Sequence, residues 1–154
     1  MQRPPDPLRE VLAVEQTDLP LKRRWFENDY FDLFTWQDAA GALTKFQLYY
    51  DVELNEHALV WNRSVGTYHD GVDSGDGTRQ TPILVHSGKK FDSGTVVPRF
   101  ERDSANVPSE VRDLVLAKMR EHLLSEYRLK IGRDKVRREQ WQKRRAAAKG
   151  APQN

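Results

Sequence analysis

Histidine is the first residue type to consider, because its imidazole binds metal ions and moves protons near neutral pH. The chain contains four histidines, which are His57, His69, His86 and His122. None of them lies in the His-x-x-x-His or Glu-x-x-His spacing that places two metal ligands on one face of a helix. His57, His69 and His86 fall on separate expected strands, so only the fold can bring them together. We therefore predict no metal site and no cofactor.

A second candidate for metal chemistry is the stretch 69–77, which reads HDGVDSGDG. A calcium loop of the EF-hand type needs ligands at alternate positions and a glutamate further along the loop. Here the acids recur at every third position, and no glutamate occupies the matching site. We therefore predict a Gly/Asp loop over 70–77 and no calcium site.

The sequence gives little support for nucleophilic or acid–base catalysis. The sequence contains no cysteine, which excludes disulfides, thiolate metal sites and cysteine nucleophiles. It also lacks the Gly-x-Ser-x-Gly motif and the glycine motifs that bind phosphate. Asp32 and Asp51 flank aromatic strands, which allows partial burial, but acids at strand ends are commonly solvated, and no acid–base pair stands out among the 23 carboxylates. We expect no catalytic residues. An enzyme that binds a small molecule or a metal, with histidines and aspartates in one deep pocket, is our third hypothesis.

The C-terminal end of the chain is strongly basic. From Arg128 onward there are ten Lys/Arg against two acids, a net charge of +8, whereas residues 1–127 carry a net charge of −6. Lysine and arginine neutralise phosphates and release counterions, and tryptophan stacks on bases. The residues that we expect to contact nucleic acid are Arg133, Lys135, Arg137, Arg138, Trp141, Lys143, Arg144 and Arg145. The tail lacks the broad apolar face of a helix that lies on a membrane, so we predict no membrane partner.

Aromatic side chains crowd into residues 25–61. Most of them are expected in a tightly packed core, since aromatic residues dominate core burial. If both faces of a sheet carry aromatics, the face away from the helices becomes a candidate surface for a protein partner. Trp36 and Tyr49 are the two residues that we expect on this second face.

Periodicity predicts the elements that position these residues. Strand patterns cover 30–36, 43–50, 57–62, 64–69 and 81–86. A short helix is expected over 93–101, and apolar residues at spacings of three and four predict a longer helix over 106–127, with Asn106 as its cap. Gly132 is expected to interrupt this pattern, so that the tail beyond it is helical only when bound or packed. The fold class is therefore α+β, an antiparallel β-meander of about five strands packed by C-terminal helices, with a basic helical tail.

Length and composition predict one folded domain. We divide the chain into an extended N-terminal lead-in over 1–20, a single α+β domain over 21–131 and a basic tail over 132–154. No apolar run approaches the roughly 20 residues of a membrane span. The N-terminus also lacks the basic and then continuously apolar pattern of a secretory signal, and we expect a cytoplasmic protein.

Several strand patterns resemble those of a group of small bacterial proteins to which no activity is assigned. These patterns are RRWF at 23–26, YFDL at 30–33, FQLYYD at 46–51, ALVW at 58–61 and TPILV at 81–85. The resemblance covers about residues 23–120 and leaves the basic tail outside it. It implies a bacterial, cytoplasmic origin and transfers no catalytic residue.

The leading hypothesis is a non-catalytic binding or accessory domain that acts through protein contacts of its sheet face or tail, with self-association as one form of such contact. The second hypothesis is a nucleic-acid-associated protein that works through the tail. The sequence alone does not choose between a protein and a nucleic acid as the partner.

Overall fold

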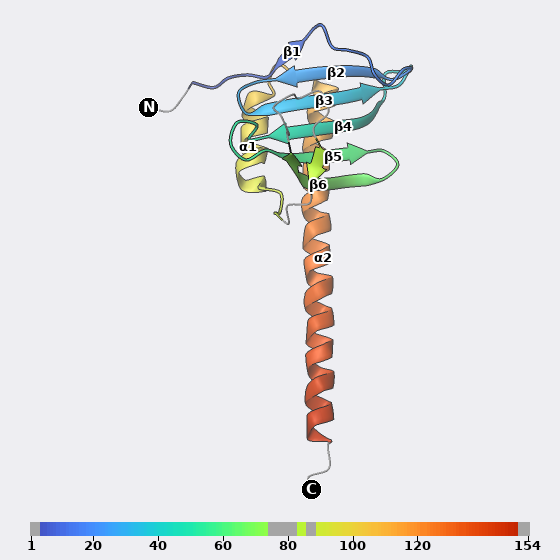
Figure 1. The fold of residues 1–154 in the computed structure, drawn as a ribbon, viewed down its shortest axis with the longest axis vertical. Coiled ribbons are helices and arrows are strands. Elements are labelled where there is room, and N and C mark those ends of the chain that lie inside the picture. The colour runs from blue at the N-terminus through green and yellow to red at the C-terminus, as the bar shows by residue number, and fades with distance from the viewer. Residues whose placement is uncertain (1–3, 74–82, 86–88, 151–154) are drawn as a thin grey trace.

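A computed structural model describes residues 4–73, 83–85 and 89–150. It contains one antiparallel sheet, in which neighbouring strands follow one another in the order of the sequence. The strands are β1 (Arg9–Val11), β2 (Lys22–Glu27), β3 (Phe31–Gln37), β4 (Leu43–Tyr50), β5 (His57–Asn62), β6 (Gly66–Asp73) and β7 (Ile83–Val85). Two helices follow, α1 (Ser93–Asp103) and α2 (Ser109–Lys149). The α+β class and the antiparallel meander are confirmed (Figure 1).

The sheet has more strands than the five that periodicity predicts. Strand β1 is three residues long, too short to show an alternation. Strand β2 begins with three basic residues, KRR, ahead of its aromatic pair, and such a start lacks the apolar signal of a strand. Both segments join the sheet because they pair with a neighbouring strand. Phe26 of β2 lies opposite Leu33 of β3, and Glu10 of β1 lies opposite Phe26.

The predicted Gly/Asp loop is wrong over its first residues. Residues 70–73 belong to β6, where Asp70 pairs with Ala58 and Gly71 pairs with His57. The backbone of a strand accepts glycine and aspartate when its neighbour supplies the hydrogen-bonding ladder. Residues 74–77 lie outside the described residues. The strand expected over 81–86 is found at Ile83–Val85.

One face of the sheet carries the main hydrophobic core. Phe46 and Leu48 of β4 lie on this face and are fully buried, as the period-two pattern predicts. Helix α1 contributes Val96 and Phe100, and the first turns of α2 contribute residues such as Met119. Figure 1 shows both helices against this side of the sheet.

Helix α2 begins and ends differently from the prediction. Its first residue is Ser109, it follows Pro108, and no side chain caps its N-terminus. The expected cap by Asn106 is therefore wrong, because the buried Val107, whose N–H donates to the Ser104 carbonyl, fixes the backbone at this point. The helix also runs through Gly132 without a break to Lys149. One glycine costs about 1 kcal/mol in a helix, and the residues around it favour helix.

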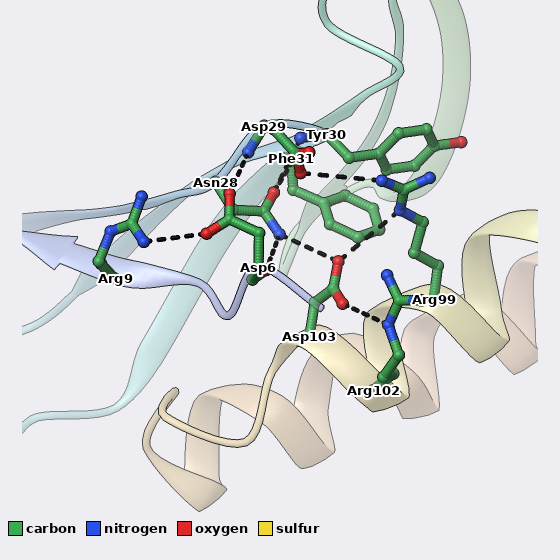
Figure 2. Close-up of polar contacts among 9 residues, drawn as sticks. All are labelled: Asp6, Arg9, Asn28, Asp29, Tyr30, Phe31, Arg99, Arg102 and Asp103. Atoms are coloured by element: carbon green, nitrogen blue, oxygen red, sulfur yellow. Dashed lines mark hydrogen bonds and ion pairs between the residues drawn. The ribbon is translucent and has the colours of Figure 1, made fainter. Parts of the chain in front are cut away.

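A polar cluster ties the N-terminal segment to the sheet and to α1 (Figure 2). The buried Asp103 accepts a hydrogen bond from Asn28 Nδ2 at 3.0 Å and one from Arg102 Nε at 2.8 Å. Asn28 Nδ2 also donates to the Asp6 carbonyl, and the Leu8 N–H donates to the Asp103 carbonyl. The completely buried Leu8 is therefore held next to the core by backbone and side-chain hydrogen bonds. The domain boundaries at residues 21 and 131 stay a prediction.

Among the described residues, neither helix combines the length and the apolar content that crossing a bilayer requires.

Candidate functional site

The residues that we expect to contact nucleic acid all lie on the distal part of α2. The buried side chains of this helix end at His122, and every residue from Tyr127 to Lys149 is exposed. At 1.5 Å per residue this distal part is roughly 35 Å long. Figure 1 shows it projecting away from the sheet as a single helix. We call residues 127–149 the projecting helix.

The projecting helix is cationic on all of its sides. Successive residues of an α-helix are about 100° apart, and at this spacing the ten Lys/Arg from Arg128 onward are distributed around the whole circumference. Among the residues that the structure describes, none of these ten side chains forms an ion pair with an acid. Their charges are therefore directed to solvent and are available to an anionic partner.

Trp141 adds an aromatic surface to this cationic helix. Its side chain is 57% exposed, and the guanidinium of Arg145, one helical turn further on, lies 4.9 Å from its ring centroid. This contact is a cation–π interaction of modest strength at an exposed site. A planar group such as a base can stack on the indole of a tryptophan with this exposure.

The projecting helix and the turn before it also carry exposed apolar side chains. Leu124, Tyr127 and Ile131 are exposed and lie at spacings of three and four, which places them on one side of the helix. Leu129 and Val136 flank Gly132 on a different side and line a shallow groove. These apolar stripes are narrow, and arginine side chains border the groove.

Trp36 and Tyr49 lie on the second face of the sheet, but they are not exposed. Their side chains are 5% and 4% exposed. Trp36 Nε1 donates to Asp18 Oδ2 at 2.9 Å, and the Tyr49 hydroxyl donates to Gln47 Oε1 at 2.9 Å. Burial raises the pKa of Tyr49 to about 12. The expected exposed aromatic patch is therefore absent at these two residues, and their role in protein binding stays a prediction.

The fold brings three of the four histidines together between the sheet and α2. The rings of His57 and His69 are stacked with centroids 5.5 Å apart, and the ring of His122 lies 6.3 Å from that of His69. His86 lies outside the described residues. Within the described part of the chain, no group of three histidine and acidic side chains is arranged to hold a metal ion. Sequence spacing does not reveal this cluster, because its members come from β5, β6 and α2.

Hydrogen bonds fix the tautomer of His69. Its Nδ1 faces the Lys89 carbonyl at 3.1 Å, and its Nε2 faces the Tyr50 hydroxyl at 2.6 Å. A carbonyl can only accept, so Nδ1 carries the hydrogen and Nε2 accepts from Tyr50. Burial lowers the pKa of His69 below its ordinary value, which is consistent with a neutral ring. Burial also raises the pKa of Tyr50, which keeps its hydroxyl protonated.

A polar cavity of about 190 Å³ opens beside this cluster, and we call it the His57 cavity. Its lining residues are Tyr30, Tyr50, Asp51, Asn55, His57, Lys89, Lys90 and Asp92. Burial, and then the charge of Asp51, raise the pKa of the Tyr30 hydroxyl, to which Asp92 also contributes. Asp51 and Asp92 line the same cavity as Tyr30. The sequence indicates His57 and Asp51 separately, whereas Lys89 and Lys90 escape prediction because two adjacent lysines have no distinctive pattern.

Of the two acids that flank the aromatic strands, Asp32 is buried and Asp51 is partly buried. Asp32 is 4% exposed and its Oδ1 accepts a hydrogen bond from Trp25 Nε1 at 3.0 Å. Asp51 is intermediate in exposure and lies at the edge of the His57 cavity. The two carboxylates lie in different surroundings, which gives no support to an acid–base pair made of both.

Comparisons of the chain with protein-family models, with curated proteins and with solved structures found no match. The resemblance to small bacterial proteins therefore stays a prediction.

Proposed function

We propose that this protein binds nucleic acid, and that the projecting helix makes the contacts. The observation that carries the proposal is the exposure of every residue from Tyr127 to Lys149 on a segment whose net charge from Arg128 onward is +8. A helix that does not pack against the body gains little stability from tertiary contacts. We therefore expect a cationic helix of this length to be stabilised most by an anionic partner.

The expected contacts are with phosphates. Double-stranded DNA carries one negative charge per about 1.7 Å of its axis, so a helix roughly 35 Å long can lie beside many phosphates. A helix with cations on all sides can contact the phosphates of a nucleic acid from any side. Reading base edges instead requires one defined face of the helix to lie in a groove. We therefore expect binding with steep salt dependence and little sequence preference.

The body of the protein supports this assignment of the contacts. Residues 1–127 have a net charge of −6, so the sheet and its helices repel a polyanion while the projecting helix attracts it. The charge asymmetry orients the encounter, because long-range fields steer association. Trp141, next to the cationic side chains, is the residue that we expect to add stacking on unpaired bases.

Self-association is a second candidate function, and the exposed side chains of Leu124, Tyr127 and Ile131 favour it. A helix with apolar residues at spacings of three and four can pair with a second helix. The stripe is short, however, and the tail beyond it carries like charges that repel a second copy. Sedimentation equilibrium of the full-length protein at high salt, compared with the variant Ile131→Gln, measures this alternative directly.

Fluorescence anisotropy with labelled single- and double-stranded oligonucleotides tests the proposed function. The variant Arg137→Gln/Arg144→Gln removes two cations of the projecting helix and keeps a residue that favours helix. The matched control is Arg63→Gln/Arg120→Gln, which removes two exposed cations of the body that form only long ion pairs of 3.9 and 3.7 Å. We expect the first variant to bind more weakly and the control to bind at least as tightly as the unchanged protein.

A further inference from the structure

We propose that the nucleic acid bound by the projecting helix has unpaired bases, and that Trp141 with the arginines around it forms the site for one such base. We call Trp141, Arg137, Arg138, Arg144 and Arg145 the Trp141 platform. This choice of single strands over duplexes rests on the proposed binding of nucleic acid and names its substrate class.

Trp141 is the exposed one of the four tryptophans. Trp36 and Trp61 are 5% and 7% exposed, and Trp25 is partly buried with its Nε1 donating to Asp32 at 3.0 Å. Trp141 is 57% exposed and belongs to the helix that projects away from the sheet (Figure 1). The indole contributes nothing to the core there, and tryptophan favours helix less than leucine or glutamine does. Folding therefore does not account for a tryptophan at this position.

Pairing with a second helix does not account for Trp141 either. The three–four spacing of the exposed apolar stripe, continued beyond Ile131, gives Asp134, Arg138, Trp141 and Arg145. A helix–helix seam needs apolar residues at these positions, and here three of the four are charged. Bringing two copies together at Trp141 would remove these charges from water at a large cost. The indole is therefore available to a partner that is itself anionic.

Arginine occupies each of the four positions that surround Trp141 on the helix surface. Arg137 and Arg138 lie four and three residues before it, and Arg144 and Arg145 lie three and four residues after it. Residues at these spacings have Cβ atoms roughly 5–6 Å apart, and the guanidinium of Arg145 lies 4.9 Å from the centroid of the indole. A guanidinium can bind a phosphate through two hydrogen bonds at once, which an ammonium cannot. A base on the indole therefore has arginines on both sides of it, along the helix axis, for the phosphates that flank it.

The availability of base faces distinguishes a single strand from a duplex. In a duplex each base is stacked between its neighbours, and the grooves present only base edges. In a single strand the faces of the bases are accessible, and any base can stack on an aromatic side chain. A duplex can therefore use the arginines of the Trp141 platform but not its indole, whereas a single strand can use both.

The test is fluorescence anisotropy of the full-length protein with three labelled oligonucleotides of equal length at one low salt concentration. They are a thymidine strand, a strand with the same sugars and phosphates but no bases, and a blunt duplex. The abasic strand keeps the charge and removes the surfaces for stacking. We expect the thymidine strand to bind about tenfold more tightly than the abasic strand. A uridine strand distinguishes RNA from DNA as the source of the unpaired bases.

Variants locate the stacking contact. Trp141→Gln removes the ring and keeps a residue that favours helix. It is expected to weaken binding of the thymidine strand about tenfold, to the level of the abasic strand, and to change binding of the duplex by less than about twofold. Trp141→Phe keeps a smaller ring and should retain part of the preference. The matched control is Tyr68→Thr, which removes a 39% exposed aromatic side chain of β6 and should leave all three affinities unchanged.

Circular dichroism at 222 nm shows whether each variant keeps its helix. If Trp141→Gln loses helix, the comparison of thymidine and abasic strands with the unchanged protein still decides the outcome. Equal binding of these two strands overturns the stacking site, and so does a Trp141→Gln variant that loses affinity equally for the duplex and the single strand. In either case steep salt dependence leaves the proposed binding of nucleic acid in place, whereas no binding of any oligonucleotide at low salt overturns both proposals.

Anionic lipid is the other partner that a helix with arginines and a tryptophan can meet. Sedimentation with phosphatidylglycerol vesicles tests it with the same variants. Vesicle binding that is lost in Trp141→Gln, together with equal binding of the thymidine and abasic strands, would assign the indole to a membrane surface and overturn its assignment to bases.

Discussion

Tyr50 donates its hydroxyl hydrogen to Nε2 of His69 across 2.6 Å, and the two rings are stacked with centroids 5.8 Å apart. The Nδ1–H of His69 donates to the Lys89 carbonyl at 3.1 Å. This chain of hydrogen bonds connects the segment before α1 to strands β4 and β6. It requires a neutral His69, because a protonated ring has no lone pair at Nε2 to accept from Tyr50.

The stability of the protein is therefore expected to depend on pH through His69. Burial lowers the pKa of His69 in the folded state, while the unfolded chain has the ordinary value of about 6.5. Between these two values the unfolded state binds more protons, so the free energy of unfolding falls as the pH drops below about 6.5. Urea unfolding at pH 7.5 and pH 5.5 measures the difference. The variant His69→Gln, which does not titrate, should lose less stability over this range. An equal loss in both proteins means that another group is responsible.

The buried carboxylate of Asp103 is expected to contribute strongly to stability. It accepts hydrogen bonds from Asn28 and Arg102, and Asp103→Ala leaves those donors without their acceptor. Arg99 and Arg102 are partly exposed, so their side chains can form hydrogen bonds with water in the variant. We therefore expect the free energy of unfolding to fall by about 2 kcal/mol. Urea unfolding measures it. Asp113→Ala, at an exposed position of α2, is the control and should change stability by less than about 0.5 kcal/mol. Similar losses for the two variants contradict the role of Asp103.

The projecting helix is expected to unfold separately from the body. A Cβ added at Gly132 meets no atom within 4 Å, so Gly132→Ala stabilises the helix by about 1 kcal/mol without new contacts. Circular dichroism at 222 nm should show more helix in the variant. The near-ultraviolet melting temperature, which reports the packed core, should not change. A rise in that temperature means that the projecting helix and the core unfold together.

Much of the fold follows from local patterns in the sequence. Alternation in β4 correctly places Phe46 and Leu48 on the core side, and the three–four spacing of α2 correctly identifies its packed part as far as Leu123. The last residue of that pattern, Tyr127, is exposed. Strand β1 escapes prediction because its three residues gain their structure from pairing with β2. The prediction that Gly132 interrupts the helix is wrong, because one unfavourable residue is outweighed by many neighbours that favour helix.

The two candidate sites also differ in how far the sequence predicts them. The basic residues of the projecting helix are contiguous in the sequence, so composition alone reveals them. The His57 cavity joins residues 30, 50–57 and 89–92, which only the three-dimensional register brings together. The burial of Trp36 is also a tertiary effect, because its indole donates to Asp18 from a segment that the sequence marks only as extended.

The salt dependence of oligonucleotide binding shows whether the projecting helix contacts phosphates. We would measure the dissociation constant for one double-stranded oligonucleotide at several salt concentrations, for the unchanged protein and for Arg137→Gln/Arg144→Gln. Each lost phosphate contact lowers the slope of log K against log salt by about 0.9. If both arginines contact phosphates, the slope of the variant should therefore be shallower by about 1.8. No binding at low salt, or identical slopes for the two proteins, contradicts the binding of nucleic acid by the projecting helix.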